Sequence, residues 1–206
     1  LAVSDGAAAI AFSSDDAQSA YSSLRMDGID ADAPVDFSRP VALPEGSRDA
    51  RFRIVQMPVD ATPGCRSFLC QHFTPDVVWR PEYLQHPIGV TGIAGVSVVA
   101  EDARGAAQAY GRVLQVGVGK GGDDVVVPVG DAMLSFSARV ALQERLASAP
   151  LTRRPAPVLA ALHLRVRDRA HAAETLRRGG FSARRLADGT LAVGADQAHG
   201  VALVFD

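Results

Sequence analysis

A chain of 206 residues with 48% hydrophobic and 21% charged residues has the composition of a globular protein and enough length to bury a core. Its net charge of −2 gives no reason to expect nucleic-acid binding, and no apolar run approaches the roughly 20 residues that span a membrane. No signal peptide is visible, and Cys65 and Cys70 form neither a disulfide framework nor a zinc pattern, so we expect a cytoplasmic protein.

The charges are unevenly distributed along the chain. Residues 1–50 carry nine acidic side chains, whereas the stretch from Arg139 to Arg185 is rich in arginine. We interpret these stretches as solvated faces of opposite sign that can help subunits meet, so a homodimer is one expected assembly. Lys120 is the only lysine, and this usage, together with the abundance of alanine, indicates a bacterial source with a GC-rich genome.

Three segments of the chain share one pattern, and the first begins with an apolar strand at residues 7–12. Ala17, Ala20, Tyr21 and Leu24 follow at spacings of three and four, which predict one face of a helix that ends at Gly28. Three short strands complete the segment, at residues 36–41, 50–57 and 66–72.

The second and third segments repeat this order of strand, helix and three strands. Their first strands are predicted at residues 93–100 and 159–166, with helices opened by Asp102 and Asp168. The later strands are predicted at residues 113–118, 124–129 and 132–137 in the second segment, and at 183–186, 190–193 and 200–205 in the third. The fold class is therefore α+β, built from repeated βαβββ modules.

The stretch from Cys70 to Pro87, CQHFTPDVVWRPEYLQHP, resembles a motif of glyoxalase-like proteins in the vicinal-oxygen-chelate superfamily, which also contains bleomycin-resistance proteins and extradiol dioxygenases. The motif there reads approximately QH-TPE-hW-P----HPNGA, and this chain departs from it at Ile88, where asparagine is usual. The modular pattern on either side extends the resemblance over nearly the whole chain.

The resemblance implies that modules pair into a curved mixed sheet of eight strands. Residues 92–206 hold such a pair, at 92–137 and 158–206, and residues 74–91 form a linker motif. Residues 1–73 form a module whose pairing partner we expect either before residue 1 or in another subunit, because an unpaired module would expose the inner face of its sheet.

Metal enzymes of the superfamily place a histidine near the start of a first strand and a glutamate on a last strand. The corresponding first-strand positions here are Ala8, Gly95 and Ala161, and the last-strand positions fall near Phe68 or Cys70, Ser135 and Val204. None of the first-strand residues can bind a metal, and none of the last-strand residues is a carboxylate. The resemblance therefore leaves a divalent metal as the implied cofactor without its usual ligands.

His72 is the best remaining candidate for a catalytic or metal-binding residue, because it follows the last strand of the first module and shares the parity of Phe68 and Cys70. It can bind a metal, act as a base, hold an anion, or simply bond the backbone as a linker histidine. His86, which precedes Pro87 in the motif, is a second candidate for ligand binding, with a structural role in the linker as the alternative.

A separate candidate binding set follows from strand parity in the paired modules. Ser97, Ser135, His163 and Arg165 are predicted to face inward, where an imidazole and a guanidinium can hold a carboxylate or phosphate. A water-filled sheet face without a ligand is the alternative. His171 and His199 are predicted to be exposed and structural.

Two functions remain open. One is a divalent-metal-dependent lyase, isomerase or dioxygenase that acts on a small oxygenated molecule, with His72 as the base. The other is a protein that binds or sequesters a small molecule without chemistry, which fits the lack of carboxylate ligands. The sequence does not decide whether the chain is an enzyme, and the ligand is unknown.

Overall fold

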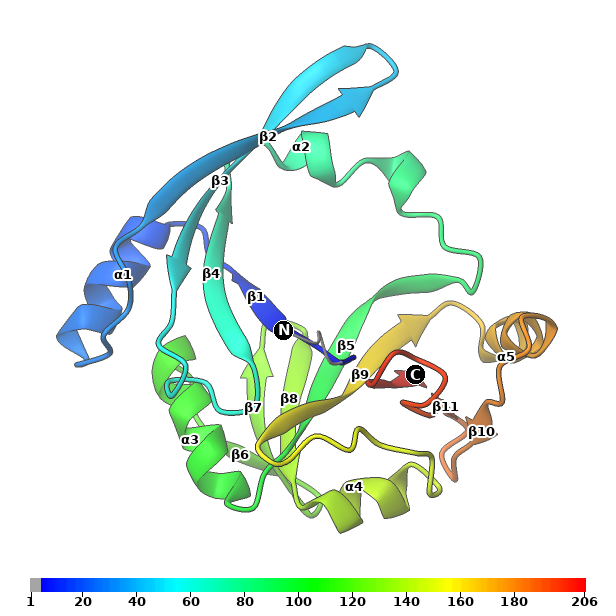
Figure 1. Cartoon of the computed structure of the whole chain (residues 1–206). Helices are drawn as coiled ribbons and strands as arrows, with labels where there is room; N and C mark the ends of the chain where they lie inside the picture. The colour runs from blue at the N-terminus through cyan, green and yellow to red at the C-terminus, as the bar shows by residue number, and fades with distance from the viewer. Residues whose placement is uncertain (1–4) are drawn as a thin grey trace. The chain divides into compact units, whose positions relative to one another are not determined.

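The structure is a computed structural model that describes residues 5–206, and it divides into two compact units. The N-terminal unit contains residues 9–62 and 66–84, and the C-terminal unit contains residues 63–65 and 85–206 together with residues 5–8. Each unit has its own sheet, of four strands in the first and eight in the second (Figure 1). The α+β fold class with repeated βαβββ modules is confirmed.

The N-terminal unit is one βαβββ module followed by two short helices. Its sheet has the order β1-β4-β3-β2, in which β1 pairs with β4 in parallel and the other pairs are antiparallel. Asp16 caps the first helix by accepting hydrogen bonds from the backbone N–H groups of Gln18 and Ser19. The elements are β1 (Ala9–Ser13), α1 (Ala17–Met26), β2 (Val35–Leu43), β3 (Gly46–Gln56), β4 (Arg66–His72), α2 (Pro75–Val78) and the 3₁₀ helix η1 (Pro81–Tyr83).

The C-terminal unit joins two further modules through their first strands. Its eight-stranded sheet has the order β10-β11-β12-β9-β5-β8-β7-β6, with β5 and β9 antiparallel at the centre. Each of these two strands also pairs in parallel with the last strand of its own module. The elements are β5 (Val90–Val99), α3 (Ala103–Leu114), β6 (Gly119–Gly121), β7 (Asp124–Val129), β8 (Ala132–Ser137), α4 (Arg139–Arg145), β9 (Val158–Val166), α5 (Arg169–Arg178), β10 (Arg184–Arg185), β11 (Leu191–Val193) and β12 (Ala202–Phe205).

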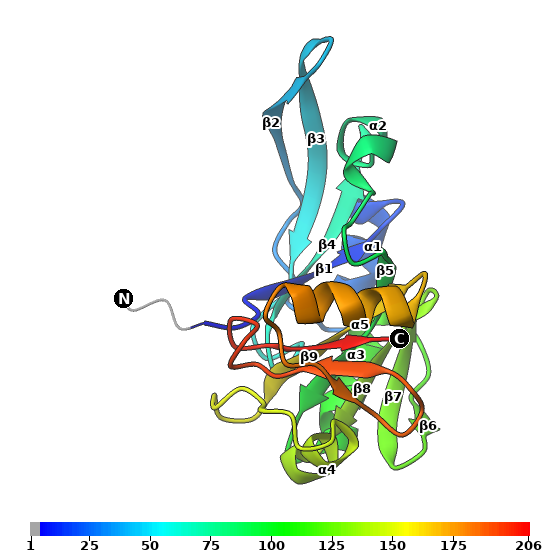
Figure 2. The ribbon, with the colours of Figure 1, turned by 90° about the vertical axis from the view of Figure 1, so that its right-hand side faces the viewer.

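Helices α3 and α5 cover the same face of this sheet, which we call the outer face. The ring of Tyr110 on α3 lies 5.2 Å from that of Phe136 on β8, and Phe205 on β12 packs in a cluster with Leu176 on α5. Figure 2 shows α5 and α4 on opposite sides of β11. Side chains alternate along a strand, so Ser135 and Val204, the neighbours of these two phenylalanines, point to the opposite, inner face. Among the described residues, no helix is long and apolar enough to cross a membrane.

The predicted strand at residues 113–118 is wrong. Val113 is buried and belongs, with Leu114, to the last turn of α3, and the strand is β6 at Gly119–Gly121. The apolar run was ambiguous because the buried face of a helix and a strand both place valines there. Gln115 ends the helix in the left-handed conformation, with φ 55°, a conformation in which glutamine gives no sequence signal.

The sequence indicates no element between Ser137 and Val158, yet α4 lies there and covers part of the inner face. Its Leu142 and Leu146 are buried in a cluster with Ala161, Ala192 and Val204, which lie on three different strands of the sheet. Near the far end of the helix, Arg145 donates to the Asp124 carboxylate at 2.8 Å and to the Ser137 hydroxyl at 3.1 Å. Part of the inner face is therefore covered by the protein itself.

Stability should depend on pH through Asp124. Burial raises the pKa of this carboxyl, and the guanidinium of Arg145 lowers it less. The folded chain therefore holds the proton more tightly than the unfolded chain, so this stabilising contribution is complete below the ordinary pKa of about 3.9 and is lost as the pH rises through the folded-state pKa. Urea unfolding of the parent and of Asp124→Asn gives the difference between their free energies of unfolding. We expect this difference to fall as the pH rises over this range. A difference that rises with pH would contradict this assignment.

Candidate functional site

Three of the predicted binding residues meet on the inner face of the C-terminal unit. Ser97 on β5 has its Oγ 2.8 Å from Oγ of Ser135 on β8 and 2.8 Å from Nε2 of His163 on β9. The strand pairing explains this, because Ser97 is the register partner of Ser135 and His163 is the register partner of Gly95, two residues before Ser97. Only 1% of Ser97 is exposed, whereas the side chain of His163 is 24% exposed.

Asp206, which the sequence analysis did not select, faces the other nitrogen of the His163 ring. Its Oδ1 lies 3.9 Å from Nδ1, which is beyond hydrogen-bond distance but close enough to favour a proton on Nδ1. With the proton on Nδ1, Nε2 can accept a hydrogen bond from the Ser97 hydroxyl, and Ser97 can accept one from Ser135. A signal for Asp206 existed, because it continues the parity of Ala202 and Val204, whose register partners are Ala161 and His163.

Arg165 is held by Asp131, the second residue that sequence reasoning missed. Its Nη1 lies 3.0 Å from the Asp131 carboxylate, and Nη2 donates to the Asp131 backbone carbonyl. Asp131 lies in the turn between β7 and β8, where the sequence shows only a turn signal. Arg165 is therefore neutralised by a neighbouring turn rather than left free for a ligand anion, although its side chain remains 37% exposed.

The order Ser97, His163, Asp206 is the one that activates a serine nucleophile, but the geometry does not support that chemistry. The Ser97 hydroxyl is buried and already hydrogen-bonded to Ser135 and His163, and the 3.9 Å separation leaves the imidazole without a hydrogen bond donated to Asp206 that would orient it. The arrangement is better suited to recognition. A ligand hydroxyl between Nδ1 and Oδ1 can accept from the imidazole and donate to the carboxylate.

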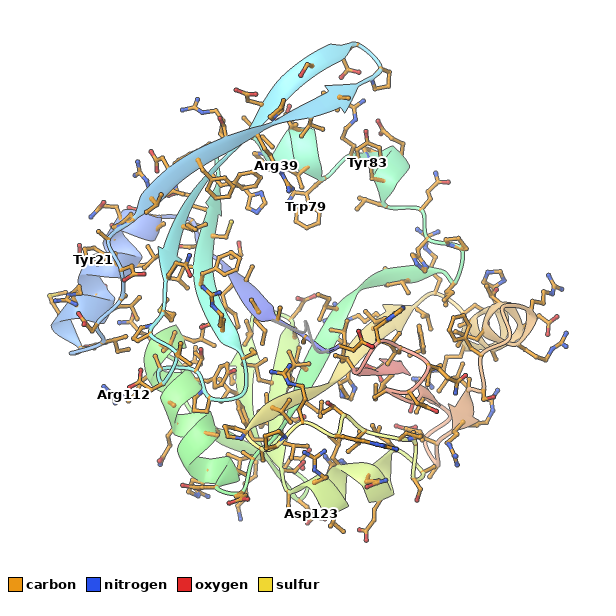
Figure 3. The ribbon with its side chains drawn as sticks, in the orientation of Figure 1. Tyr21, Arg39, Trp79, Tyr83, Arg112 and Asp123 are labelled. Carbon is orange, nitrogen blue, oxygen red and sulfur yellow. The ribbon has the colours of Figure 1, made fainter. Side chains whose placement is uncertain are left out.

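His72 lies in the N-terminal unit, at the end of β4, inside a row of aromatic side chains. Its ring is edge-on to Phe52 at a centroid distance of 4.8 Å and lies 6.0 Å from Trp79. Arg39 lies over Phe52 on the same face of the sheet (Figure 3). Nδ1 of His72 is buried and has no hydrogen-bond partner among the described residues, so the ring does not bond the backbone through this atom.

His86 belongs to the C-terminal unit and is exposed. Its Nδ1 accepts a hydrogen bond from the backbone N–H of Ile88 at 3.2 Å, and its carbonyl accepts one from Gly89. The ring thus closes a turn ahead of β5. It does not join the Ser97, Ser135 and His163 cluster through any hydrogen bond that the structure shows.

The described residues offer no donor set for a metal ion. Within residues 5–206, no three side chains of the His, Cys, Asp and Glu types lie close enough together to share an ion. The resemblance implies metal ligands at four positions of the C-terminal unit. Gly95 and Ala161 occupy those on the first strands, and Ser135 and Val204 occupy those on the last strands. His163 and Asp206 provide two donors at most.

Comparison with known proteins identifies similar domains. The model of a family described as a glyoxalase-like domain matches residues 1–114. The chain is also similar in structure to a hypothetical protein from Staphylococcus aureus, with a TM-score of 0.58, 9% identity, and 94% of this chain aligned to 63% of that one. For a Mn(II)-bound glyoxalase from Novosphingobium aromaticivorans, the TM-score is 0.55, the identity 13%, and the coverage 96% and 61%.

These structural similarities show the fold alone. The chain spans less than two thirds of the length of either protein. No curated protein matches the sequence.

Proposed function

The chain belongs to the glyoxalase-like domain family, whose model covers more than half of its length, and from this premise we propose that it binds a small oxygenated molecule without metal chemistry. The observation that carries the proposal is the chemistry of the inner face. Where the superfamily's metal enzymes were expected to offer imidazole and carboxylate ligands, this chain offers a hydrogen-bonded cluster of Ser97, Ser135 and His163. Such groups recognise hydroxyl and carbonyl oxygens directly.

A Mn(II) ion is named for one similar structure, but the residues of this chain do not fit that group. The first strands present Gly95 and Ala161, and the described residues contain no cluster of three donors. The proposed binding therefore involves no metal. The ligand's oxygen would instead lie beside His163 and Asp206, whose side chains are 24% and 33% exposed.

The metal-dependent lyase, isomerase or dioxygenase with His72 as base is the second candidate, and one observation favours it. The buried Nδ1 of His72 has no hydrogen-bond partner among the described residues, and such an atom is often reserved for a ligand or a proton. Its nearest rings are those of Phe52 and Trp79, which add no metal ligand. This candidate therefore needs donors that the described residues do not bring to His72.

For the N-terminal βαβββ module we propose that its sheet pairs with the sheet of another βαβββ module. In the described residues β1 pairs only with β4, whereas β5 and β9 each pair additionally with the other's module. The free edge of β1 suits the first strand of a further module, and a second copy of the chain in a homodimer is one source of it.

Ligand binding should depend on His163. We expect titration with glycolate, lactate or catechol, each with a hydroxyl beside a second oxygen, to raise the melting temperature of the protein. His163→Ala should weaken that binding by about tenfold or more, because a partly buried hydrogen-bonding partner is lost. His199→Asn is the control, since His199 is exposed and has a positive φ that asparagine tolerates.

Metal analysis of protein purified without chelator separates the two candidates. Stoichiometric metal that disappears in His72→Ala would support the enzyme and overturn the metal-free proposal. Binding of all three probes that is equally strong in His163→Ala and the parent would show that the Ser97 cluster is not the binding site.

A further inference from the structure

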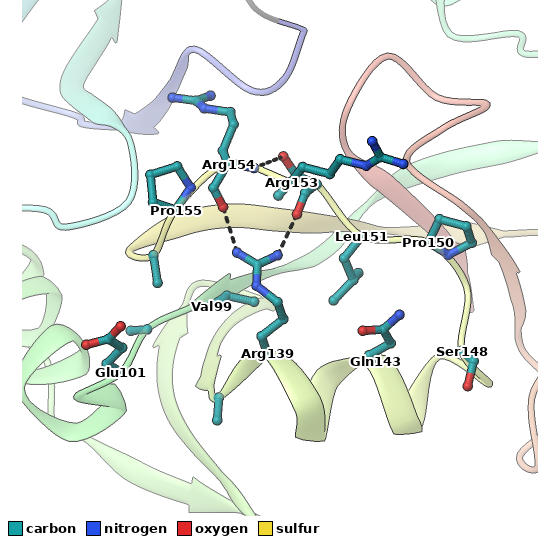
Figure 4. A pocket seen from close by; sticks show the side chains of 14 residues that line it. Val99, Glu101, Arg139, Gln143, Ser148, Pro150, Leu151, Arg153, Arg154 and Pro155 are labelled. Carbon is teal, nitrogen blue, oxygen red and sulfur yellow. Dashed lines mark hydrogen bonds between the residues drawn. The ribbon is translucent and has the colours of Figure 1, made fainter.

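The C-terminal unit contains a cavity of about 750 Å³ that shares no residue with the Ser97 cluster. It lies between α4, the segment at residues 148–156 and the end of β5 (Figure 4). Val99 and Leu151 give it an apolar wall, and Gln143 adds a side-chain amide. Arg139, Arg153 and Arg154 supply its positive charge.

Arg139 holds this cavity in shape. Its Nη1 donates to the backbone carbonyl of Thr152 at 2.5 Å, and its Nη2 donates to that of Arg154 at 2.6 Å. Both ends of the guanidinium fork therefore fix the same short segment over α4, as the dashed lines in Figure 4 show. Because carbonyls are neutral, these bonds leave the charge of Arg139 without a compensating carboxylate.

The positive charge of the lining arginines is not balanced by acidic groups around the cavity. In the part of the chain that the structure describes, none of Arg139, Arg153 and Arg154 lies within 4.0 Å of a carboxylate, whereas Arg145 on the same helix pairs with Asp124. Glu101 is the one acidic residue in the lining. Three arginines and one glutamate line the cavity, so the net charge of its lining favours an anion.

We propose that this cavity binds a small molecule carrying an oxyanion, either a phosphate or a carboxylate. The side chains of Arg153 and Arg154 are exposed and point away from α4 in Figure 4, and Nη1 of Arg154 donates to the backbone carbonyl of Ala7 at 3.3 Å. Both side chains would turn toward the cavity to bind the oxyanion, because guanidinium forks match the oxygens of both groups. The apolar wall receives the ligand's carbon skeleton. This site is independent of the proposed function, since it uses neither His163 nor Asp206.

Calorimetric titration of the full chain with inorganic phosphate and, separately, with succinate tests the proposal and distinguishes the two sources of the oxyanion. The double variant Arg153→Gln/Arg154→Gln should bind the preferred probe about tenfold to a hundredfold more weakly, and added salt should weaken binding to the parent. These side chains are exposed, so the variant is expected to remain folded.

Arg167→Gln/Arg185→Gln is the matched control, because it removes the same charge from exposed side chains outside the cavity. It should bind like the parent. If neither phosphate nor succinate binds the parent, or if both double variants lose affinity equally, the cavity is not an oxyanion site. A similar loss in His163→Ala would also overturn the proposal, because it would place the anion at the Ser97 cluster.

Discussion

Leu142→Ala is expected to lower the free energy of unfolding by about 2–5 kcal/mol, the range for removing a leucine side chain from a packed core. Leu142 is 1% exposed and is part of the cluster that joins α4 to the inner face of the C-terminal sheet. The helix has only seven residues, too few to be stable alone, so its position depends on this packing. Urea unfolding followed by circular dichroism measures the change.

Val140→Ala on the same helix is the control for Leu142→Ala. Val140 is 68% exposed, and its loss should change the free energy of unfolding by less than about 0.5 kcal/mol. The structure divides into two units, so calorimetry should also show whether they unfold in one transition or two, and which transition the substitution shifts. Equal effects of the two substitutions would mean that α4 does not pack on the sheet through Leu142.

Gly95→Ala is expected to destabilise the protein by about 3 kcal/mol, the upper end of the range for overpacking. Gly95 pairs with Met133 across β5 and β8, and a Cβ at this position would lie 2.3 Å from the carbonyl oxygen of Met133. The obstacle is backbone rather than a flexible side chain, so the two strands must separate to admit a methyl group. The free energy of unfolding in urea tests this.

Gly92→Ala on the same strand provides the comparison. A Cβ there would meet only the end of the Arg165 side chain, at 3.5 Å, so the substitution should be neutral or stabilising by roughly 0.5–1 kcal/mol. If Gly95→Ala is equally harmless, β5 and β8 are not as close as the structure shows. The same clash predicts that Gly95→His, which would place an imidazole where the resemblance implies a metal ligand, disrupts the sheet before it creates a ligand.

Strand parity was informative about the inner face because side chains in a strand alternate with a period of two whatever the partner. It put Ser97, Ser135 and His163 on one face from the sequence. Parity does not fix register, however, so it could not show that the hydroxyl of Ser97 would lie 2.8 Å from both of the others. Register comes from the paired backbones of β8, β5 and β9.

The contact partners of Arg165 and His72 could not be predicted from strand parity either. Arg165 was expected to be available to an anion, but the turn carrying Asp131 neutralises it across β5. His72 was a candidate because it follows the last strand of the first module, and its contacts with other rings depend on pairing between β3 and β4 and on the position of Trp79. The contacts of Arg165 with Asp131 and of His72 with Phe52 leave no local pattern, because these residues lie far apart in the chain, whereas Trp79 follows His72 within the same motif.

By itself, the sequence determined the βαβββ repeat and the family, because helix and strand periodicity and a contiguous motif are local properties. Only the tertiary structure decided that α4 packs on part of the inner face and that Arg139 donates hydrogen bonds to the carbonyls of Thr152 and Arg154. These features arise when a short segment with weak intrinsic structure finds an apolar surface made by several strands. That surface exists only after the sheet has formed, so no stretch of sequence encodes it alone.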